Sequence, residues 1–409
     1  MARTARGKRA ARIFLALLLI AAVLGFVYGD ELRRVYRVNH LFDPDVIVEN
    51  FRSMDTLFPT SPVAAGGTIS HFERAPGPLP SHYVYRGKRK SVRQFLEETW
   101  TTGLITIADG KMVYEEYFRG NEVGSRTISW SVAKSVVSAL IGIAIAEGHI
   151  SGTGAAVTDY VPELEGTGYG NVTIEDVLTM SSGVRFNEDY GDFNSDINRM
   201  GRAIAFNTAI DEFVASLKPA RPPGTYHHYV SMDTQVLAMV LREATGESLS
   251  SYMQSRLWQP LGAGASAFWL VDRNGMELAF GCLNATLRDY ARFGQLYLQE
   301  GDWAGRQIVP ADWVRRSVNP RAARLQPGPN PSSDTVLGYG YQWWIPGGDE
   351  DDYLAIGIYN QFIYVNPTRA VVIAKSSAYP RYNTDGVAKE LETIAMFRSI
   401  AEQIANETR

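Results

Sequence analysis

A chain of 409 residues with 45% hydrophobic content and no low-complexity tract is expected to fold as one large or two interlocked globular domains. The formal net charge of −4 provides no basic field for a polyanion, which excludes nucleic acid as an expected partner. The single cysteine excludes an internal disulfide. Six histidines without an H-E-x-x-H or C-x-x-C pattern give no indication of a metal or other cofactor.

The first 29 residues combine a basic start with an apolar run. Five Lys or Arg residues and no acid occur in the first twelve positions, and residues 13–28 carry no charge. This pattern predicts a signal peptide or a membrane anchor, at the short end of the ~17–25 residues of a span. No clear A-x-A cleavage site follows, which favours an anchor with its basic end in the cytoplasm. The rest of the chain would then be exported, periplasmic in a Gram-negative cell, or secreted if the segment is cleaved.

Residues from about 30 to 100 are interpreted as an irregular, proline-punctuated lead-in, of which 30–60 is the lead-in segment that precedes the main domain. A helix is expected to start after Ser91, because apolar residues then recur at helical spacing. Strands at 104–108 and 112–118 flank Asp109 and Gly110, a residue pair that favours a two-residue hairpin turn.

The middle of the chain, about residues 126–284, is expected to be mainly helical. Thr173 and Asp176 have the spacing of a capping box at a helix start. Apolar residues in 234–244 follow helical spacing, and Gly246 is placed to end that helix.

Strands return near the end of the chain. Segments 354–365 and 370–376 are rich in β-branched and aromatic residues and are separated by a turn sequence, and 384–407 follows as a helix. We therefore expect a mixed α/β (α+β) fold. Its antiparallel sheet, about 61–125 plus 285–409, would be flanked by helices and interrupted by the inserted helical region.

Ser131 and Lys134 form an S-x-x-K pair at the head of an apolar stretch that indicates a buried helix. Residues three apart share one helical face, so the Lys134 amine can lie beside the Ser131 hydroxyl. Burial would lower the pKa of this amine, and a neutral amine can accept the proton of the serine. Lys134 alone among the lysines has a Ser three places before it.

Two further segments are candidates for the same site. Tyr229 follows a Pro-Gly turn and directly precedes a helix, so it is a candidate proton shuttle, with a packed surface tyrosine as the alternative. Gly357 lies within a strand, where glycine often marks a close approach of ligand to backbone, with a β-bulge as the alternative. The N–H group after Gly357 and that of Ser131 could together hold an oxyanion.

These clusters, in this order, resemble the penicillin-recognising serine hydrolases, which include class C β-lactamases, DD-peptidases and related esterases and amidases. The resemblance is closest to the 6-aminohexanoate-dimer hydrolase branch and spans about residue 50 to the C-terminus. The segments that carry it are 131–134, 178–183, 223–224, 229–237, 258–262, 284–294, 340–344 and 357–361.

The resemblance implies a role for each candidate residue. Ser131 would be the nucleophile, Lys134 its base and Tyr229 the proton shuttle, and the backbone N–H groups of Ser131 and Ile358 would form the oxyanion hole. The substrate-binding residues would be Tyr190, Ser231 and Gly357.

Two departures from the resemblance bear on the substrate. The β-lactamase Y-x-N triplet is Tyr229-Val230-Ser231 here. The K-T-G triplet is replaced by Ala355-Ile356-Gly357, which removes the lysine that would pair with a substrate carboxylate. Both departures disfavour strong β-lactamase or carboxypeptidase activity.

The sequence therefore predicts that 61–409 is an exported serine hydrolase domain. It would cleave a small ester or amide through an acyl-enzyme on Ser131, without a cofactor or metal. The alternatives are a cell-wall DD-peptidase or β-lactamase, a non-catalytic binding or sensing module of the same fold, and an α/β-hydrolase, which lacks its G-x-S-x-G signature here. The expected partners are a small-molecule substrate and, through the N-terminal segment, a membrane. The oligomeric state stays open.

Overall fold

The computed structural model describes residues 35–205 and 208–408, with short pieces at 13–16, 18–19, 29 and 33. The predicted signal peptide or anchor therefore lies mostly outside the described residues. Among the helices that are described, none has the length and apolar character needed to cross a membrane.

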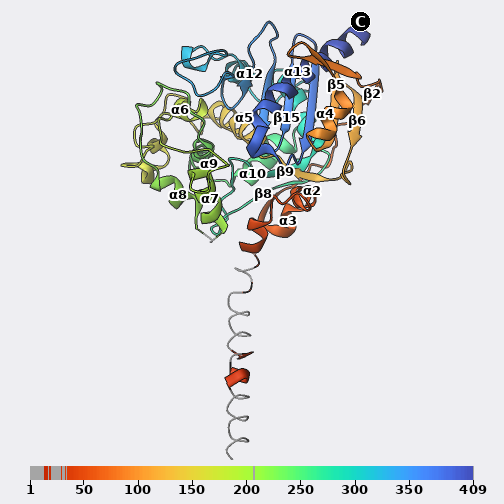
Figure 1. Ribbon diagram of the computed structural model, residues 1–409. Helices are drawn as coiled ribbons and strands as arrows, with labels where there is room; N and C mark the ends of the chain where they lie inside the picture. Colours follow the sequence, from red (N-terminus) through yellow and green to blue (C-terminus); the bar gives the residue numbers. More distant parts are fainter. Residues whose placement is uncertain are drawn as a thin grey trace, which may run out of the picture.

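Segments far apart in the sequence form one eight-stranded sheet (Figure 1). Its strands are β2 (Glu73–Arg74), β5 (Thr101–Ala108), β6 (Lys111–Tyr117), β12 (Gly338–Tyr339), β13 (Trp344–Ile345), β14 (Tyr353–Gly357), β15 (Gln361–Asn366) and β16 (Val371–Ser377). Their spatial order is β12-β13-β14-β15-β16-β5-β6-β2, so late strands pair directly with early ones. All neighbours are antiparallel except β2 and β6 at one edge, which are parallel.

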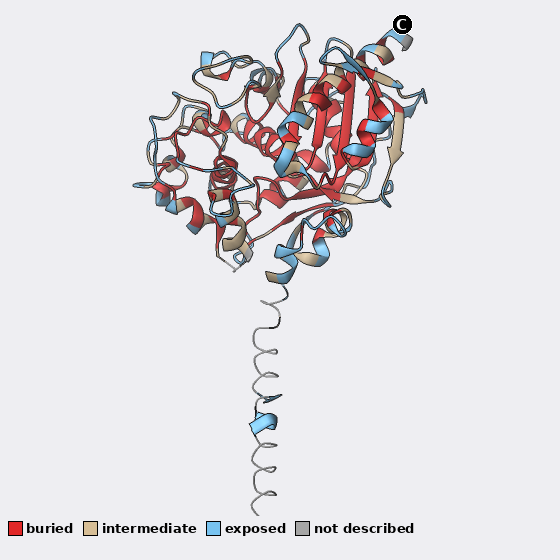
Figure 2. Ribbon diagram, in the orientation of Figure 1, coloured by how far each residue is buried: buried red, intermediate tan, exposed pale blue. Residues whose placement is uncertain are grey.

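Both faces of this sheet are covered by helices. Successive residues of β16 alternate between two apolar clusters, since Val372 and Ala374 belong to one and Val371 and Ile373 to the other. The first cluster includes residues of α5 (Val132–Ala146) and α11 (Leu287–Leu298), and the second includes residues of α4 (Val92–Glu98) and α13 (Tyr382–Thr408). The central strands are accordingly buried along their length (Figure 2).

The inserted region contains α5 and, after it, α6 (Ile174–Leu178), α7 (Asp196–Ala205), α8 (Ile210–Ser216), α9 (Ser231–Thr245) and α10 (Leu249–Met253). Of these, α9 packs most extensively against α5. A second sheet, of order β1-β8-β9-β7, consists of β1 (Thr60–Val63), β7 (Arg126–Ile128), β8 (Ala267–Leu270) and β9 (Leu283–Thr286). Further elements are the hairpins β3 (His82–Tyr85) with β4 (Lys88–Ser91) and β10 (Asp302–Trp303) with β11 (Arg306–Gln307), and helix α12 (Ala311–Val318).

Local signals in the sequence are confirmed where they depend on short-range chemistry. Asp109 and Gly110 both have positive φ, 47° and 76°, as the expected two-residue hairpin turn requires. Ser91 caps α4 by accepting a hydrogen bond from the Gln94 N–H, and Thr173 and Asp176 form the predicted capping box of α6. Gly246 ends α9 in a left-handed conformation.

Two expectations were wrong. The predicted single strand 354–365 is two antiparallel strands, β14 and β15, because the chain reverses at Tyr359 and Asn360, both of positive φ. The apolar, β-branched composition continues across this turn and conceals it. The lead-in segment is also not wholly irregular. It contains α2 (Ile47–Arg52) and α3 (Met54–Leu57), whose buried residues Ile47, Phe51 and Met54 belong to the main core, and four short strands follow before residue 92.

Candidate active site

Ser131 and Lys134 lie together at the start of α5. Ser131 occupies the N-cap position, and Lys134, in the first turn, is 1% exposed. Lys134 Nζ lies 2.9 Å from Ser131 Oγ, a hydrogen-bonding distance. It also lies 3.3 Å from Ser231 Oγ and donates a hydrogen bond to the Phe280 carbonyl. The predicted serine and lysine contact is therefore present.

The burial of α5 determines the electrostatics of Lys134. Burial disfavours the ammonium form and lowers the pKa of Lys134 to about 8, although the charges of Glu188, Cys282 and Asp233 act in the opposite direction. A substantial fraction of this amine is consequently neutral near pH 8, and a neutral amine beside a hydroxyl can accept its proton.

A buried glutamine fixes the carbonyl that Lys134 contacts. Gln235 of α9 donates from Nε2 to the Glu277 carbonyl at 2.9 Å and accepts from the Ala279 N–H at 2.9 Å. These bonds hold the loop 277–282, which carries Phe280, against α9. The Phe280 carbonyl in turn restricts where the Lys134 amine can lie.

Tyr229 lies two residues before α9, with its ring beside Lys134. The ring stacks on Trp344 at a centroid distance of 5.4 Å and an interplanar angle of 17°, and Lys134 Nζ lies 5.1 Å from the Tyr229 centroid. Burial raises the pKa of the Tyr229 hydroxyl well above its ordinary value, as does the charge of Glu188, whereas an interaction with Ser131 lowers it. Tyr229 is thus placed within the site and stays protonated near neutral pH.

Glu188 is a site residue that the sequence analysis did not identify. It accepts hydrogen bonds from the Ser231 N–H at 3.0 Å, from Ser231 Oγ at 2.5 Å and from the Tyr190 hydroxyl at 2.9 Å. Two of the predicted substrate-binding residues therefore meet at one carboxylate. Glu188 stands among other polar residues in the sequence, so nothing local distinguishes it from an exposed acid.

Gly357 closes the site from the main sheet. A Cβ atom at this position would lie 2.5 Å from the Ser129 carbonyl oxygen and 3.1 Å from the Ser131 nitrogen, so no side chain fits. The backbone of β14 thus ends against that of Ser131, and the next residue, Ile358, lines the same cavities as Ser131. The close approach predicted for Gly357 is between two backbones.

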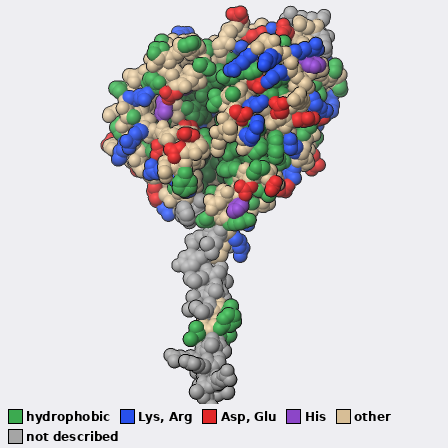
Figure 3. Space-filling model, in the orientation of Figure 1, with side chains coloured by type: hydrophobic (Ala, Val, Ile, Leu, Met, Phe, Trp, Pro, Cys, Tyr) green, Lys and Arg blue, Asp and Glu red, His purple; other side chains and the backbone are tan. Residues whose placement is uncertain are grey.

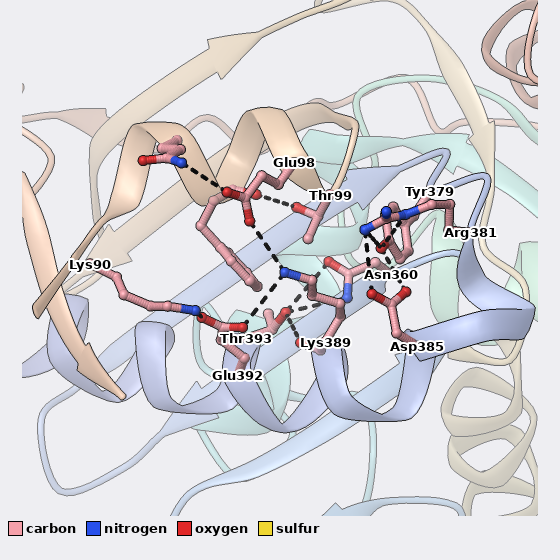
Figure 4. A network of polar contacts seen from close by, with 12 residues as sticks. Lys90, Glu98, Thr99, Asn360, Tyr379, Arg381, Asp385, Lys389, Glu392 and Thr393 are labelled. Carbon is pink, nitrogen blue, oxygen red and sulfur yellow. Dashed lines mark hydrogen bonds and ion pairs between the residues drawn. The ribbon is translucent and has the colours of Figure 1, made fainter. Parts of the chain in front are cut away.

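The turn after Ile358 is held from the α13 side. Asn360 Nδ2 donates to Thr393 Oγ1 at 3.3 Å, and Thr393 in turn bonds to the Lys389 carbonyl. Lys389 forms ion pairs with Glu98 at the end of α4 and with Glu392 (Figure 4). This network ties the strand end that carries Ile358 to both helices on that face of the sheet.

Two cavities meet at Ser131. The polar cavity, of about 420 Å³, is lined by Tyr229, Trp344 and four acidic residues, Glu188, Asp189, Asp334 and Glu390. The apolar cavity, of about 240 Å³, is lined mainly by aliphatic and aromatic side chains. Ser131, Tyr190, Ile358 and Asn383 line both. Figure 3 shows one face of the molecule, on which hydrophobic side chains gather around a hollow near its centre.

The two adjacent histidines have partners other than Ser131. His227 Nδ1 lies 3.0 Å from Ser333 Oγ, and burial lowers its pKa to about 4, so it is neutral at neutral pH. His228 contacts Asp334 and the Phe186 carbonyl. Within the described part of the chain, no group of three or more His, Cys, Asp or Glu residues is placed to hold a metal ion.

Comparison with known proteins defines the family. Residues 89–393 match the β-lactamase family model. A 6-aminohexanoate-dimer hydrolase from Paenarthrobacter ureafaciens is 32% identical over 306 residues, which cover 72% of this chain and 76% of that protein. The chain belongs to the β-lactamase family. It is thus a hydrolase of the predicted family.

Solved structures of other proteins share the fold. A Bacillus anthracis protein described as a 6-aminohexanoate-dimer hydrolase superposes with a TM-score of 0.80 at 24% identity, over 90% of this chain and 96% of that one. EstCE1, a hydrolase with promiscuous acyltransferase activity, superposes with a TM-score of 0.59 at 13% identity, over 76% of this chain and 96% of that one. These similarities confirm the predicted mixed fold.

Proposed function

We propose that this β-lactamase-family member is an exported serine hydrolase that cleaves a small ester or amide through an acyl-enzyme on Ser131. The observation that carries the proposal is the 2.9 Å contact between Ser131 Oγ and the Nζ of a buried lysine whose pKa is lowered to about 8. Such a contact lets a serine be activated without a histidine.

The proposed mechanism uses each group in turn. Lys134 accepts the Ser131 proton as Oγ attacks the substrate carbonyl, and the N–H groups of Ser131 and Ile358 stabilise the resulting oxyanion. Tyr229 gives a proton to the leaving oxygen or nitrogen and regains one through Lys134. Water then attacks the acyl-enzyme carbonyl and gives up a proton to Lys134, which passes it to the departing Ser131 Oγ, so that the acid product and free Ser131 result.

The charges around Ser131 support an ester or amide substrate without a carboxylate near the reacting bond. Among the described residues that line the two cavities there is no Lys or Arg, and the polar cavity holds four acids. A penicillin or a peptide ending in D-Ala carries a carboxylate, which these acids would repel. The geometry therefore favours an esterase or amidase over a cell-wall DD-peptidase or β-lactamase.

Intact-mass spectrometry tests this proposal. The full chain, purified in detergent, is exposed separately to a short-chain p-nitrophenyl ester and to a penicillin, with Ser131→Ala as the control. Ester turnover or an acyl adduct that disappears in Ser131→Ala, without a penicillin adduct, supports the proposal. A stable penicillin adduct would indicate cell-wall chemistry, and no reaction with either compound would favour a binding or sensing module.

Export is supported by the sequence pattern of residues 1–29, a basic start followed by an uncharged apolar run. Protease accessibility tests it. In cells whose outer envelope has been removed and whose cytoplasmic membrane is intact, externally added protease should degrade the domain while a cytoplasmic marker survives. Survival of both would contradict export.

A further inference from the structure

The apolar cavity beside Ser131 has no charged side chain among its described lining residues. Its described lining contains no Asp, Glu, Lys, Arg or His, although the cavity reaches the nucleophile. The side chains come from several separate segments, chiefly the lead-in (Val38, Leu41, Phe42, Met54, Phe58), α7 (Ile197, Met200, Ile204), residues 270–271 at the end of β8, loop 278–282 and the turn after β14. Segments distant in the sequence thus converge on one apolar space that ends at Ser131.

The lead-in segment forms one side of this space through aromatic packing. Phe42 stacks on Tyr359 at a centroid distance of 5.1 Å, and Phe51 lies edge-on to Trp130 at 5.3 Å. The Asn50 side chain donates to the Leu41 carbonyl at 3.0 Å and so fixes the turn that presents Phe42. Trp130 and Tyr359, which line this cavity with Ser131, are therefore covered by residues that precede the first strand.

The position of Tyr229 distinguishes the two sides of the reacting carbonyl. Tyr229 lines the polar cavity and not the apolar one. A group that protonates the leaving atom must reach it, so the leaving group lies in the polar cavity. With the carbonyl oxygen held between Ser131 and Ile358, the remaining substituent of the carbonyl carbon points to the other side, which is the apolar cavity.

We infer that the apolar cavity is an acyl pocket for an uncharged hydrocarbon chain, so that the preferred substrates are esters or amides of medium-chain fatty acids. This inference rests on the proposed function and specifies its substrate class. Each methylene group that enters the pocket should raise kcat/KM by roughly three- to fourfold until the space is filled. An acyl chain ending in an ammonium, such as a 6-aminohexanoyl group, would find no carboxylate there and is disfavoured.

The first experiment measures kcat/KM of the full chain for p-nitrophenyl acetate, butyrate, hexanoate, octanoate and 6-aminohexanoate. We expect kcat/KM to rise at least tenfold from acetate to octanoate. The hexanoate ester should exceed the 6-aminohexanoate ester, a pair of matched length, by at least tenfold. Equal values along the series, or a preference for the ammonium chain, would overturn the acyl pocket while leaving the proposed hydrolase function intact.

Gly201 allows the pocket to be filled from α7. A Cβ atom at this position would meet no atom within 4 Å, so a side chain can begin there, and Gly201→Leu adds bulk to the pocket wall. We expect this variant to lower the octanoate-to-acetate ratio of kcat/KM at least tenfold. Arg199→Leu places the same side chain on the exposed part of α7 and should leave the ratio unchanged.

A second variant, in the lead-in segment, tests the same pocket if Gly201→Leu does not fold. Phe42→Ala removes a half-exposed ring from the pocket wall and should also lower the octanoate-to-acetate ratio, by at least threefold. A ratio that stays at the parent value in both Gly201→Leu and Phe42→Ala would overturn the inference. Absence of turnover of every ester by the parent chain would instead refute the proposed function.

Discussion

The backbone of Gly357 lies against that of Ser131, leaving no room for a methyl group between the last residue of β14 and the N-cap residue of α5. The contact joins the main sheet to the inserted helical region at the proposed nucleophile. It brings Ile358 next to Ser131 from a position more than two hundred residues away in the sequence.

This contact predicts that Gly357→Ala loses activity because it displaces the backbone at Ser131, and not because the protein unfolds. The added methyl group would have to displace the Ser129–Ser131 backbone, and a shift of about 1 Å in a reacting group costs on the order of 100-fold in rate. We expect kcat for a short-chain ester to fall at least 100-fold with a folded circular dichroism spectrum. Gly67→Ala, at an exposed loop position open to a Cβ atom, is the matched control and should keep parent activity.

Lys134 predicts a specific pH dependence. With its pKa lowered to about 8, the amine is protonated and inactive as a base below that pH, so kcat/KM should rise from pH 7 to pH 9 with a midpoint near 8. In Lys134→Met, kcat/KM should fall about 10²–10⁴-fold and lose this rise. A steady rise continuing towards pH 10 would show that Lys134 titrates as an ordinary lysine.

Lys134 should lower the stability of the folded protein, although it is proposed to be needed for activity. A pKa that is lower in the folded state than in the unfolded state means that folding is penalised below about pH 8, and that this penalty is relieved as the pH rises from 8 towards 10.5. Lys134→Met should therefore raise Tm more at pH 7 than at pH 10. Thermal unfolding at the two pH values, with the parent chain alongside, measures the difference.

Tyr229→Phe should separate turnover from binding. The phenyl ring can keep the stacking on Trp344, whereas the proton for the leaving group is lost. We expect kcat to fall about 10²–10⁴-fold for an amide substrate with KM nearly unchanged, and to fall less for an ester with a good leaving group such as p-nitrophenol. An equal loss for both leaving groups would contradict the role of proton shuttle.

Gln235 is predicted to act through Phe280. Gln235→Met would remove both hydrogen bonds between α9 and loop 277–282, at a cost of about 0.5–1.5 kcal/mol per bond in unfolding free energy, because the Ala279 N–H keeps the Glu277 carbonyl as an acceptor. The loosened loop should also displace the carbonyl that Lys134 contacts, so kcat should fall with KM little changed. Urea unfolding and steady-state kinetics test both effects. A loss of stability with unchanged kcat would leave Gln235 a structural residue only.

Glu390, which lines the polar cavity, is a second group near Ser131, after Lys134, whose pKa lies close to neutral pH. Burial raises the pKa of its carboxyl to about 7, although the hydrogen bond from the Tyr382 hydroxyl at 2.8 Å acts against the rise. Folding is therefore most favourable when this acid is protonated, and stability declines as the pH rises from 4.5 through 7. Glu390→Gln should raise Tm at pH 8 and have less effect at pH 5, whereas the exposed control Glu163→Gln should change neither.

Much of the site could be anticipated because its chemistry is encoded within short segments. The S-x-x-K spacing places Ser131 and Lys134 on one helical turn whatever surrounds them, and the glycine at 357 indicated a close backbone approach before its partner was known. Capping and turn signals at Thr173, Asp109 and Gly110 are local for the same reason. Glu188 escaped notice because its importance lies in a contact with Ser231, 43 residues along the chain.

The family motifs, the placement of Ser131 and Lys134 on a common helical face and the mixed class of fold could be predicted from the sequence, because each depends on spacing within a few residues. The chain reversal at Tyr359 after β14 and the position of Glu188 in the site became visible in the folded structure alone. The folded structure likewise placed the lead-in residues against an uncharged cavity beside Ser131. These features arise from packing between segments tens to hundreds of residues apart, where burial and charge depend on neighbours that no local pattern specifies.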